Sequence, residues 1–175
     1  LKLLACLSAA SALKPLDRRT LFSGAAAALA PARLLAPAPA SAVSGGGKDY
    51  AEATIKGQDF SGKTFNNKDF SGCDAVDTNF AKSKLRGARF FKADLARADF
   101  SGADLSAASL EGANLEGTKL TGALAEGTAF SQTILDAGDL TGADFTDAVI
   151  QPYVQKGLCG RKDVTGATRD SLFCP

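Results

Sequence analysis

The side chains that could do chemistry in this chain are cysteines and carboxylates, because the sequence contains no histidine. Histidine supplies most general bases and many metal ligands, so its absence removes the usual base of a nucleophilic enzyme. No glycine-rich phosphate loop precedes a helical pattern, and the carboxylates are spread along the chain rather than grouped. We therefore expect no enzyme: no catalytic residue, no cofactor and no metal site.

The charges that remain are unevenly distributed. Residues 98–155 contain nine acidic residues and a single basic one, Lys119, for a net charge of −8. Residues 82–97 contain six basic residues against Asp94, for a net charge of +5. Charge separated along a chain in this way is suited to recognising a charged partner.

The elements that position these charges follow a period of five residues. Between residues 53 and 152, 18 of the 21 Phe, Leu and Ile residues lie on one five-residue register that includes Ile55, Phe60 and Phe65. Neither a helix nor an alternating strand has this period, so the pattern is an internal repeat. We call each residue on this register, which continues in steps of five to Ile150, a centre. The residue two positions before a centre is small except at Gln58, Lys63 and Lys68, and the residue two positions after it is often glycine.

Runs such as ADFSG at residues 98–102 and ANLEG at residues 113–117 resemble the pentapeptide-repeat family. The resemblance implies an all-β fold, a right-handed quadrilateral β-helix with four pentapeptides in each coil. Residues 53–152 hold twenty pentapeptides, so the family's geometry implies about five coils with the apolar centres inward. Each coil of such a solenoid contacts only its neighbours, and both ends need caps.

In this geometry, residues twenty apart stack on the same side of the rod. The stacking predicts ion pairs between neighbouring coils, each contributing about 0.2–1 kcal/mol. The predicted pairs are Asp69 with Arg89, Lys84 with Asp104, Asp77 with Arg97, and Lys119 with both Asp99 and Asp139. Two stacks, Asp74 over Asp94 and Glu116 over Asp136, bring like charges together; they are either tolerated by solvent or await a cation or a basic partner.

A candidate partner surface follows from these stacks. Phe91, Leu124 and Ile134 fall off the apolar register and are expected to point outward. Phe91 lies beside Arg89 and Lys92, so it is the best single contact candidate. Glu116 and Asp136 are the acidic candidates because their stack offers no opposite charge.

Residues 1–42 have the composition of a bipartite targeting segment that is removed. Arg18 and Arg19 form a twin-arginine signal before an alanine-rich apolar run, and Ala40 and Ala42 flank a small-x-small cleavage site. The run is short and broken by proline and arginine, unlike a membrane anchor. After processing, we therefore expect no integral membrane span.

The segment before the twin arginines indicates which membrane is crossed. It contains no acidic residue ahead of Asp17 and resembles the end of a plastid transit peptide. This favours the chloroplast thylakoid lumen, with a bacterial periplasm as the alternative. Residues 43–52, which include Ser-Gly-Gly-Gly-Lys, are expected to be a linker or N-terminal cap.

Residues 153–175 break the repeat and are expected to cap the far end of the rod. Residues able to cover the core there are Tyr153, Val154, Leu158, Leu172 and Phe173. In an oxidising compartment Cys159 and Cys174, which enclose residues 160–173 of this segment, are expected to form a disulfide. The same run resembles the tail of plant and algal lumenal pentapeptide-repeat proteins. Cys73 occupies an inward small position and is expected to be a buried free thiol.

These features favour a non-catalytic scaffold or protein–protein interaction module of the thylakoid lumen. Its partner is an unidentified protein, with the lumenal side of a thylakoid complex as one candidate, and we expect no nucleic-acid partner. Two alternatives remain: an acidic rod that mimics DNA and acts on gyrase, as some bacterial members of the family do, and a redox-regulated protein switched through Cys159 and Cys174.

Overall fold

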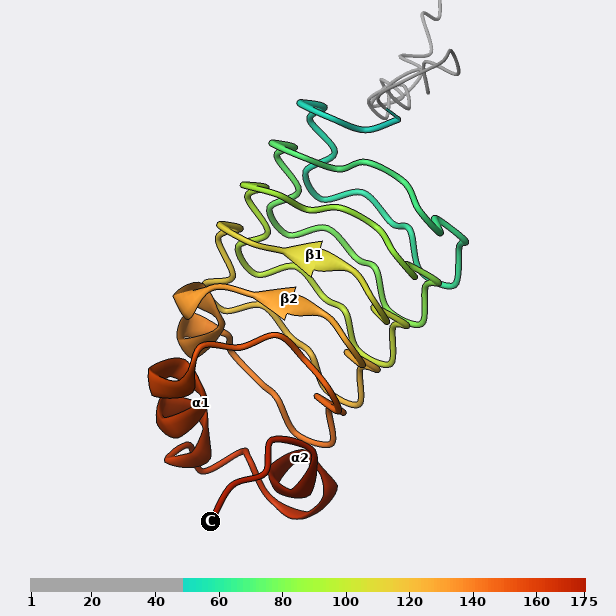
Figure 1. Ribbon diagram of the computed structural model, residues 1–175. Helices are drawn as coiled ribbons and strands as arrows, with labels where there is room; N and C mark the ends of the chain where they lie inside the picture. The colour runs from blue at the N-terminus through green and yellow to red at the C-terminus, as the bar shows by residue number, and fades with distance from the viewer. Residues whose placement is uncertain (1–48) are drawn as a thin grey trace, which may run out of the picture. The chain divides into compact units, whose positions relative to one another are not determined.

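The structure is a computed structural model that describes residues 49–175. The targeting residues Arg18, Arg19, Ala40 and Ala42 lie outside the described residues. The described chain winds into stacked coils followed by two short helices (Figure 1).

Residues twenty apart pair in parallel along the whole stack. Most straight segments pair through a single residue, and the two longest strands, β1 (Ser109–Leu110) and β2 (Ala129–Phe130), pair with each other in the same register. Each coil has four sides, numbered here by their pairing residues: side 1 holds Thr54, Asp74, Asp94 and Asn114; side 2 holds Asp59, Asn79, Asp99, Lys119 and Asp139; side 3 holds Thr64, Lys84, Asp104, Leu124 and Asp144; side 4 holds Asp69, Arg89, Ser109, Ala129 and Val149.

The corners between sides explain the repeat's polar positions. Between residues 52 and 147, except at Gln132 and Ala137, residues at the second position after a centre adopt left-handed backbone, whether glycine (Gly102, φ 64°) or not (Ala107, φ 56°). Glycine is frequent there because it adopts this conformation without steric cost. The Asp or Asn before a centre accepts a hydrogen bond from the backbone N–H two residues later, as Asp99 does from Ser101 at 2.8 Å. Such side-chain bonds favour a tight turn after each straight segment.

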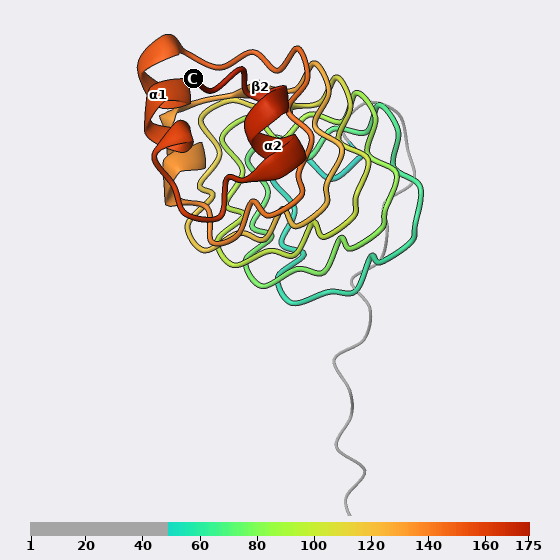
Figure 2. The same ribbon diagram turned by 90° about the horizontal axis from the view of Figure 1, so that it is seen from below.

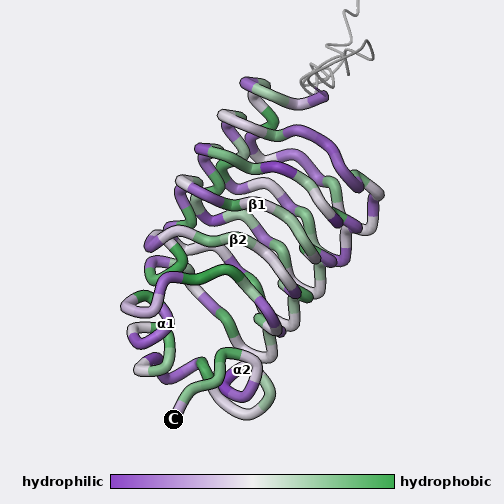
Figure 3. The backbone as a smooth tube through the Cα atoms, in the orientation of Figure 1, coloured by the Kyte–Doolittle hydropathy of each residue, from purple (hydrophilic) through white to green (hydrophobic). Residues whose placement is uncertain are grey.

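The core is the column of inward centres. From Ile55 to Phe145 every centre is buried except Leu135, which is partly exposed, as is Ile150 at the end. Aromatic rings stack between neighbouring coils: Phe70 and Phe90 have centroids 4.8 Å apart, and Phe80 and Phe100 are 4.9 Å apart. Hydrophobic and hydrophilic stretches accordingly follow one another around each coil (Figure 3).

The repeat is interrupted once, by a 3₁₀ helix, η1 (Gln132–Asp136). Ile134 lies within it and is fully buried, so the expectation that Ile134 points outward is wrong. The neighbouring centre, Leu135, is displaced towards the cap, where a Cβ on Gly157 would lie 2.9 Å from its Cδ2 atom. The chain returns to register at Gly138, whose backbone passes so close to Gly117 that a Cβ would lie 2.8 Å from the Gly117 carbonyl oxygen.

The N-terminal end is capped by Tyr50, which lies on the register of centres, and by two lysines at positions that elsewhere hold small residues. The Tyr50 ring stacks on Phe70 at 4.7 Å, in the place a preceding coil would fill. Lys63 Nζ lies 5.1 Å from the Phe60 ring centroid and donates to a backbone carbonyl, while Lys68 pairs with Asp49 at 3.0 Å. Large side chains fit at these positions because no earlier coil of the described chain lies against them.

The C-terminal end is covered by α1 (Pro152–Cys159) and α2 (Gly166–Ser171). Seen along the rod, α2 lies across the open end and α1 at its margin (Figure 2). The buried cap residues are Val154, Leu158, Val164, Thr168 and Leu172. Tyr153 and Phe173 are 58% and 75% exposed, so the expectation that they cover the core is wrong.

Side chains of the cap also satisfy backbone groups of the last coil. The Leu140 N–H donates to the Asp163 carboxylate at 2.9 Å, and the Phe145 N–H donates to Ser171 Oγ at 3.0 Å. Arg161 donates to the Leu135 carbonyl at 2.9 Å and pairs with Asp163 at 2.7 Å. The cap thus supplies hydrogen-bond partners where a further coil would otherwise provide them.

Asp163 should make the stability of the cap dependent on pH. Hydrogen bonds from Arg161 and from the Leu140 N–H hold the pKa of Asp163 below its usual value, against the opposing effect of burial. Its contribution is therefore present above the unfolded-state pKa of about 3.9 and is lost as pH falls through the lower folded-state pKa. Asp163→Asn should cost about 1 kcal/mol at pH 6 and little at pH 2, measured by denaturant unfolding.

Asp170→Asn is the control for this prediction, because the Asp170 side chain is exposed and its carboxylate accepts no hydrogen bond within residues 49–175. It should leave the pH dependence of unfolding unchanged. An Asp163→Asn variant with the same pH dependence as the parent chain would show that this carboxylate does not stabilise the cap.

Candidate functional site

The outer surface is the place to look for function. Within residues 49–175, no three His, Cys, Asp or Glu side chains are grouped closely enough to hold a metal ion. No helix in this part of the chain has the length and apolar character needed to cross a bilayer. The described surface instead offers charged stacks and a few exposed apolar side chains.

The first surface lies at the corner between sides 4 and 1, and we call it the Phe91 corner: Arg89, Phe91 and Lys92. Phe91 is 42% exposed, and Lys92 Nζ lies 5.1 Å from its ring centroid. Arg89 and Phe91 line a shallow hollow together with Ser109 and Glu111 of the next coil. The structure therefore brings together the basic and aromatic residues that the sequence singled out.

The second surface is the acidic corner between sides 1 and 2, formed by Glu116 and Asp136. Both residues are exposed, and the Gly117 N–H donates to the Asp136 carbonyl at 3.0 Å, which stacks the two positions in successive coils. The acidic corner and the Phe91 corner lie at opposite ends of side 1, so the structure does not join them into one patch.

Arg97, the basic residue one coil before Glu116, is already engaged. Its Nε and Nη2 donate to the two carboxylate oxygens of Asp77 at 2.7 and 2.8 Å. This confirms the predicted Asp77–Arg97 pair, and the hydrogen bonds from Arg97 lower the pKa of the Asp77 carboxyl. Both side chains are largely exposed, so the pair contributes little to stability.

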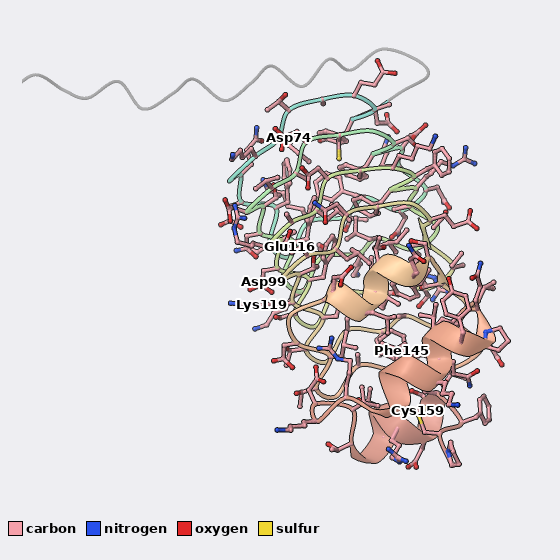
Figure 4. The ribbon with its side chains drawn as sticks, turned by 90° about the vertical axis from the view of Figure 1, so that its left-hand side faces the viewer. Asp74, Asp99, Glu116, Lys119, Phe145 and Cys159 are labelled. Atoms are coloured by element: carbon pink, nitrogen blue, oxygen red, sulfur yellow. A yellow bond between two sulfur atoms is a disulfide. The ribbon has the colours of Figure 1, made fainter. Side chains whose placement is uncertain are left out.

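Other predicted ion pairs stack in the backbone without joining their charges. Asp99 pairs in register with Lys119, beside which it lies in Figure 4, and Lys119 pairs with Asp139. In the described part of the chain, however, Lys119 forms no ion pair. Lys84 likewise forms none with Asp104 among these residues. The carboxylates instead accept hydrogen bonds from their own turns, so these two predictions are wrong in their side-chain contacts.

The like-charge stack of Asp74 and Asp94 is relieved by neutral donors. Asp94 accepts from the Asn114 side-chain amide at 3.0 Å and from the Ala96 N–H at 3.2 Å. Asp74 accepts from the Val76 N–H at 3.3 Å. The stack therefore does not need a cation to hold its geometry.

The cysteines separate into a bonded pair and a buried thiol. Cys159, at the end of α1, is joined by a disulfide to Cys174. Cys73 is a free thiol, 1% exposed, and burial together with the nearby Asp74 charge raises its pKa to about 12. Because the thiolate is the reactive form, Cys73 should be chemically slow.

Known proteins that resemble this chain share its repeat. The family model for pentapeptide repeats matches residues 59–90, 83–122 and 113–151. A pentapeptide repeat protein from the thylakoid lumen of Arabidopsis thaliana is 37% identical over 71% of this chain and 90% of that chain, with a TM-score of 0.64. Together these matches imply that the coils form a right-handed β-helix.

Two cyanobacterial structures match less well. A pentapeptide repeat protein from Nostoc is 26% identical over 58% of this chain and 83% of that one, with a TM-score of 0.47. A pentapeptide repeat protein from Cyanothece is 18% identical over 56% and 84% of the two chains, with a TM-score of 0.43. No curated protein gives a significant match.

Proposed function

The chain belongs to the pentapeptide-repeat family, and from this premise we propose that it is a non-catalytic scaffold that binds a partner protein through the outer surface of its rod. The observation that carries the proposal is the Phe91 corner. It presents an exposed aromatic ring between two basic side chains on a backbone held by pairing on both sides. Aromatic residues, phenylalanine included, and arginine are enriched in the buried cores of protein interfaces.

We place this scaffold in the chloroplast thylakoid lumen. The support is threefold: the twin-arginine signal at Arg18 and Arg19, the lumenal source of the Arabidopsis structure, and the disulfide between Cys159 and Cys174. Disulfides persist in oxidising compartments, which is consistent with an exported protein.

The two charged corners suggest what the partner presents. The Phe91 corner suits a segment that carries an acidic residue, because Arg89 and Lys92 flank the ring and outnumber the one carboxylate, Glu111, that lines the hollow from the next coil. The acidic corner, Glu116 and Asp136, suits a basic one. A partner that spans side 1 can use both, and exposed charges of this kind mainly increase the rate and specificity of association.

Capture experiments with the tagged full chain should show binding that depends on these corners. Proteins retained from a thylakoid lumen extract, but not from stroma, should be lost on Glu116→Lys with Asp136→Lys, and also on Phe91→Ala. Retention should fall as salt rises, because exposed charges are screened within about 10 Å at 0.1 M. Quantitative mass spectrometry of the eluates is the measurement.

Matched substitutions on other sides keep this test specific. Glu126→Lys changes charge at the diagonally opposite corner, and Leu124→Ala removes an exposed apolar side chain from side 3. Both should retain the partner. Equal retention of the partner by all variants would show that neither corner binds it. A partner found only in stroma would contradict the lumenal placement. Inhibition of gyrase by the chain would support the DNA-mimic alternative.

A further inference from the structure

On side 4 of the last coil, the backbone N–H and carbonyl groups of the outer β edge are left unpaired by the described chain. Side 4 of the last coil is joined to the coil before it by three backbone hydrogen bonds: Gly127 N–H to the Thr146 carbonyl at 2.9 Å, Val149 N–H to the Thr128 carbonyl at 2.9 Å, and Phe130 N–H to the Val149 carbonyl at 3.1 Å. One coil further on, the equivalent groups are the Asp147 N–H, the Ala148 carbonyl and the Ile150 N–H. Within residues 49–175 none of these three groups has a hydrogen-bond partner.

This opening contrasts with the neighbouring sides. On side 2 the Leu140 N–H donates to the Asp163 carboxylate of the cap. On side 3 the Phe145 N–H donates to Ser171 Oγ of the cap. On side 3 the cap partners one group of three, because the Gly142 N–H and the Ala143 carbonyl have no hydrogen-bond partner among residues 49–175. On side 4 the described cap partners none of the three. Unpaired strand edges are templates for an added strand, and proteins that do not use them usually blunt them with charge or proline.

The open edge lies against a small apolar hollow. Its apolar lining comes from Phe145, Ala148, Ile150, Leu172 and Phe173, and its volume is about 60 Å³. Asp147, Gln155 and Ser171 add polar groups at its margin. Val149, on the outer face of the edge, is 63% exposed. The segment one coil after β2 is accordingly coloured hydrophobic in Figure 3. The hollow can take a small apolar side chain from a strand lying on the edge.

Phe173 is held outward beside this hollow. Its backbone is left-handed, at φ 52°, a conformation that is unusual for a bulky residue, and the ring is 75% exposed. The backbone of Phe173 is fixed on both sides. Its N–H donates to the Asp170 carbonyl at 3.0 Å, and the next residue, Cys174, is held by the disulfide. An exposed aromatic ring on a fixed backbone is a preorganised contact.

A second hollow, which Phe173 also lines, is acidic. It is lined by Asp144, Asp170 and Phe173, and no basic residue contributes to its lining. Two carboxylates and an aromatic face together complement a lysine or arginine side chain. The hollow shares Ser171 and Phe173 with the apolar one, so a single segment can reach both.

We propose that this end of the rod binds an extended segment of a partner protein, which adds to the edge at residues 147–150 as a parallel strand. Continuing the parallel register sets the N-terminal end of the segment beside Asp147. A basic residue there enters the hollow between Asp144 and Asp170, and a small apolar residue further along enters the hollow beside Ile150. This site is separate from the Phe91 corner and does not depend on the lumenal role.

Fluorescence anisotropy with a labelled peptide, Arg-Thr-Val-Thr-Val-Thr, tests the proposal on the full chain. The peptide should bind, and its glutamate-headed counterpart should bind about tenfold more weakly. N-methylation of the peptide's alternate amides, which removes donors to the Ala148 carbonyl, should also weaken binding about tenfold. Phe91→Ala in the protein should change nothing, so the result is independent of the proposed scaffold surface.

Two protein variants locate the site at exposed side chains, Val149 and Asp170. Val149→Lys places a charge on the exposed face of the edge, and Asp170→Asn removes one carboxylate; each should weaken the arginine peptide severalfold. Asp136→Asn, an equal charge change at the acidic corner, should not. Absence of binding, binding indifferent to N-methylation, or equal binding by Val149→Lys would overturn the proposal. Dimerisation of the chain in sedimentation, abolished by Val149→Lys, would assign the edge to a second copy instead.

Discussion

Replacement of Phe90 by alanine should lower the free energy of unfolding by about 3–5 kcal/mol. Phe90 is fully buried, its ring stacks on Phe70 at 4.8 Å, and it meets Phe80 and Phe100 edge-on at 5.9 and 5.7 Å. The loss combines the transfer of a large apolar side chain with a cavity that the paired backbone cannot close. Equilibrium unfolding in denaturant measures it.

The adjacent Phe91 provides a control of identical chemistry. Its ring is 42% exposed and its recorded ring contact is with Lys92, so Phe91→Ala should cost about 1 kcal/mol or less. The two variants together test the inward register at a single point of the chain. Similar losses from both would mean that the ring at position 90 is not part of a closely packed column.

Loss of the disulfide should be the second large effect, and it should be local. Replacing Cys159 and Cys174 by serine opens a link across 15 residues, which is worth about 3 kcal/mol in the chain-entropy model. Since each coil contacts only its neighbours, the cap and last coil should loosen first. In hydrogen exchange, the amides of Leu140 and Phe145 should lose protection while that of Phe80 keeps it.

Thiol labelling gives an independent measure of the same prediction. The unreduced chain should react slowly, because its free thiol, Cys73, is buried with a pKa raised to about 12. After mild reduction, Cys159 and Cys174 should be alkylated before Cys73. Labelling of Cys73 first, or uniform loss of protection along the rod, would contradict a locally acting disulfide.

The inward column was predictable because every coil repeats one environment. A five-residue period places each centre in the same position relative to its neighbours, so Phe70 and Phe100 follow from the pattern alone. The interruption at η1 was not predictable in this way. Ile134 and Leu135 compete for the same inward place, and the choice depends on α1, whose Gly157 approaches Leu135.

Stacking was predictable for the charges, but their partners were not. The period puts Asp99 beside Lys119 and Lys84 beside Asp104 in the backbone ladder. Each carboxylate, however, has a donor only two residues away, as Asp104 has in Ser106, whose N–H and Oγ lie 3.1 and 2.6 Å from it. A nearby donor already ordered by the turn requires less loss of side-chain entropy than a mobile lysine does.

The ends were least predictable, because no repeat constrains them. The departures at Lys63 and Lys68 mark the first coil, and their use as a cap becomes clear only from their contacts with Phe60 and Asp49. At the other end Tyr153 and Phe173 have the apolar character of core residues but lie in solvent. Cap helices bury one stripe only, and their sequences are too short to show which.

The pairing of residues twenty apart also governs how such a chain can change length during evolution. Gain or loss of twenty residues adds or removes a whole coil and returns every later residue to its own side. Gain or loss of five keeps apolar centres inward but turns everything downstream by a quarter of the circumference. Deleting one pentapeptide between Phe91 and Glu116 would shift Glu116 to the place of Glu111, on the same corner as Phe91. Indels in units of five can therefore assemble new surface combinations from old residues while the core stays filled.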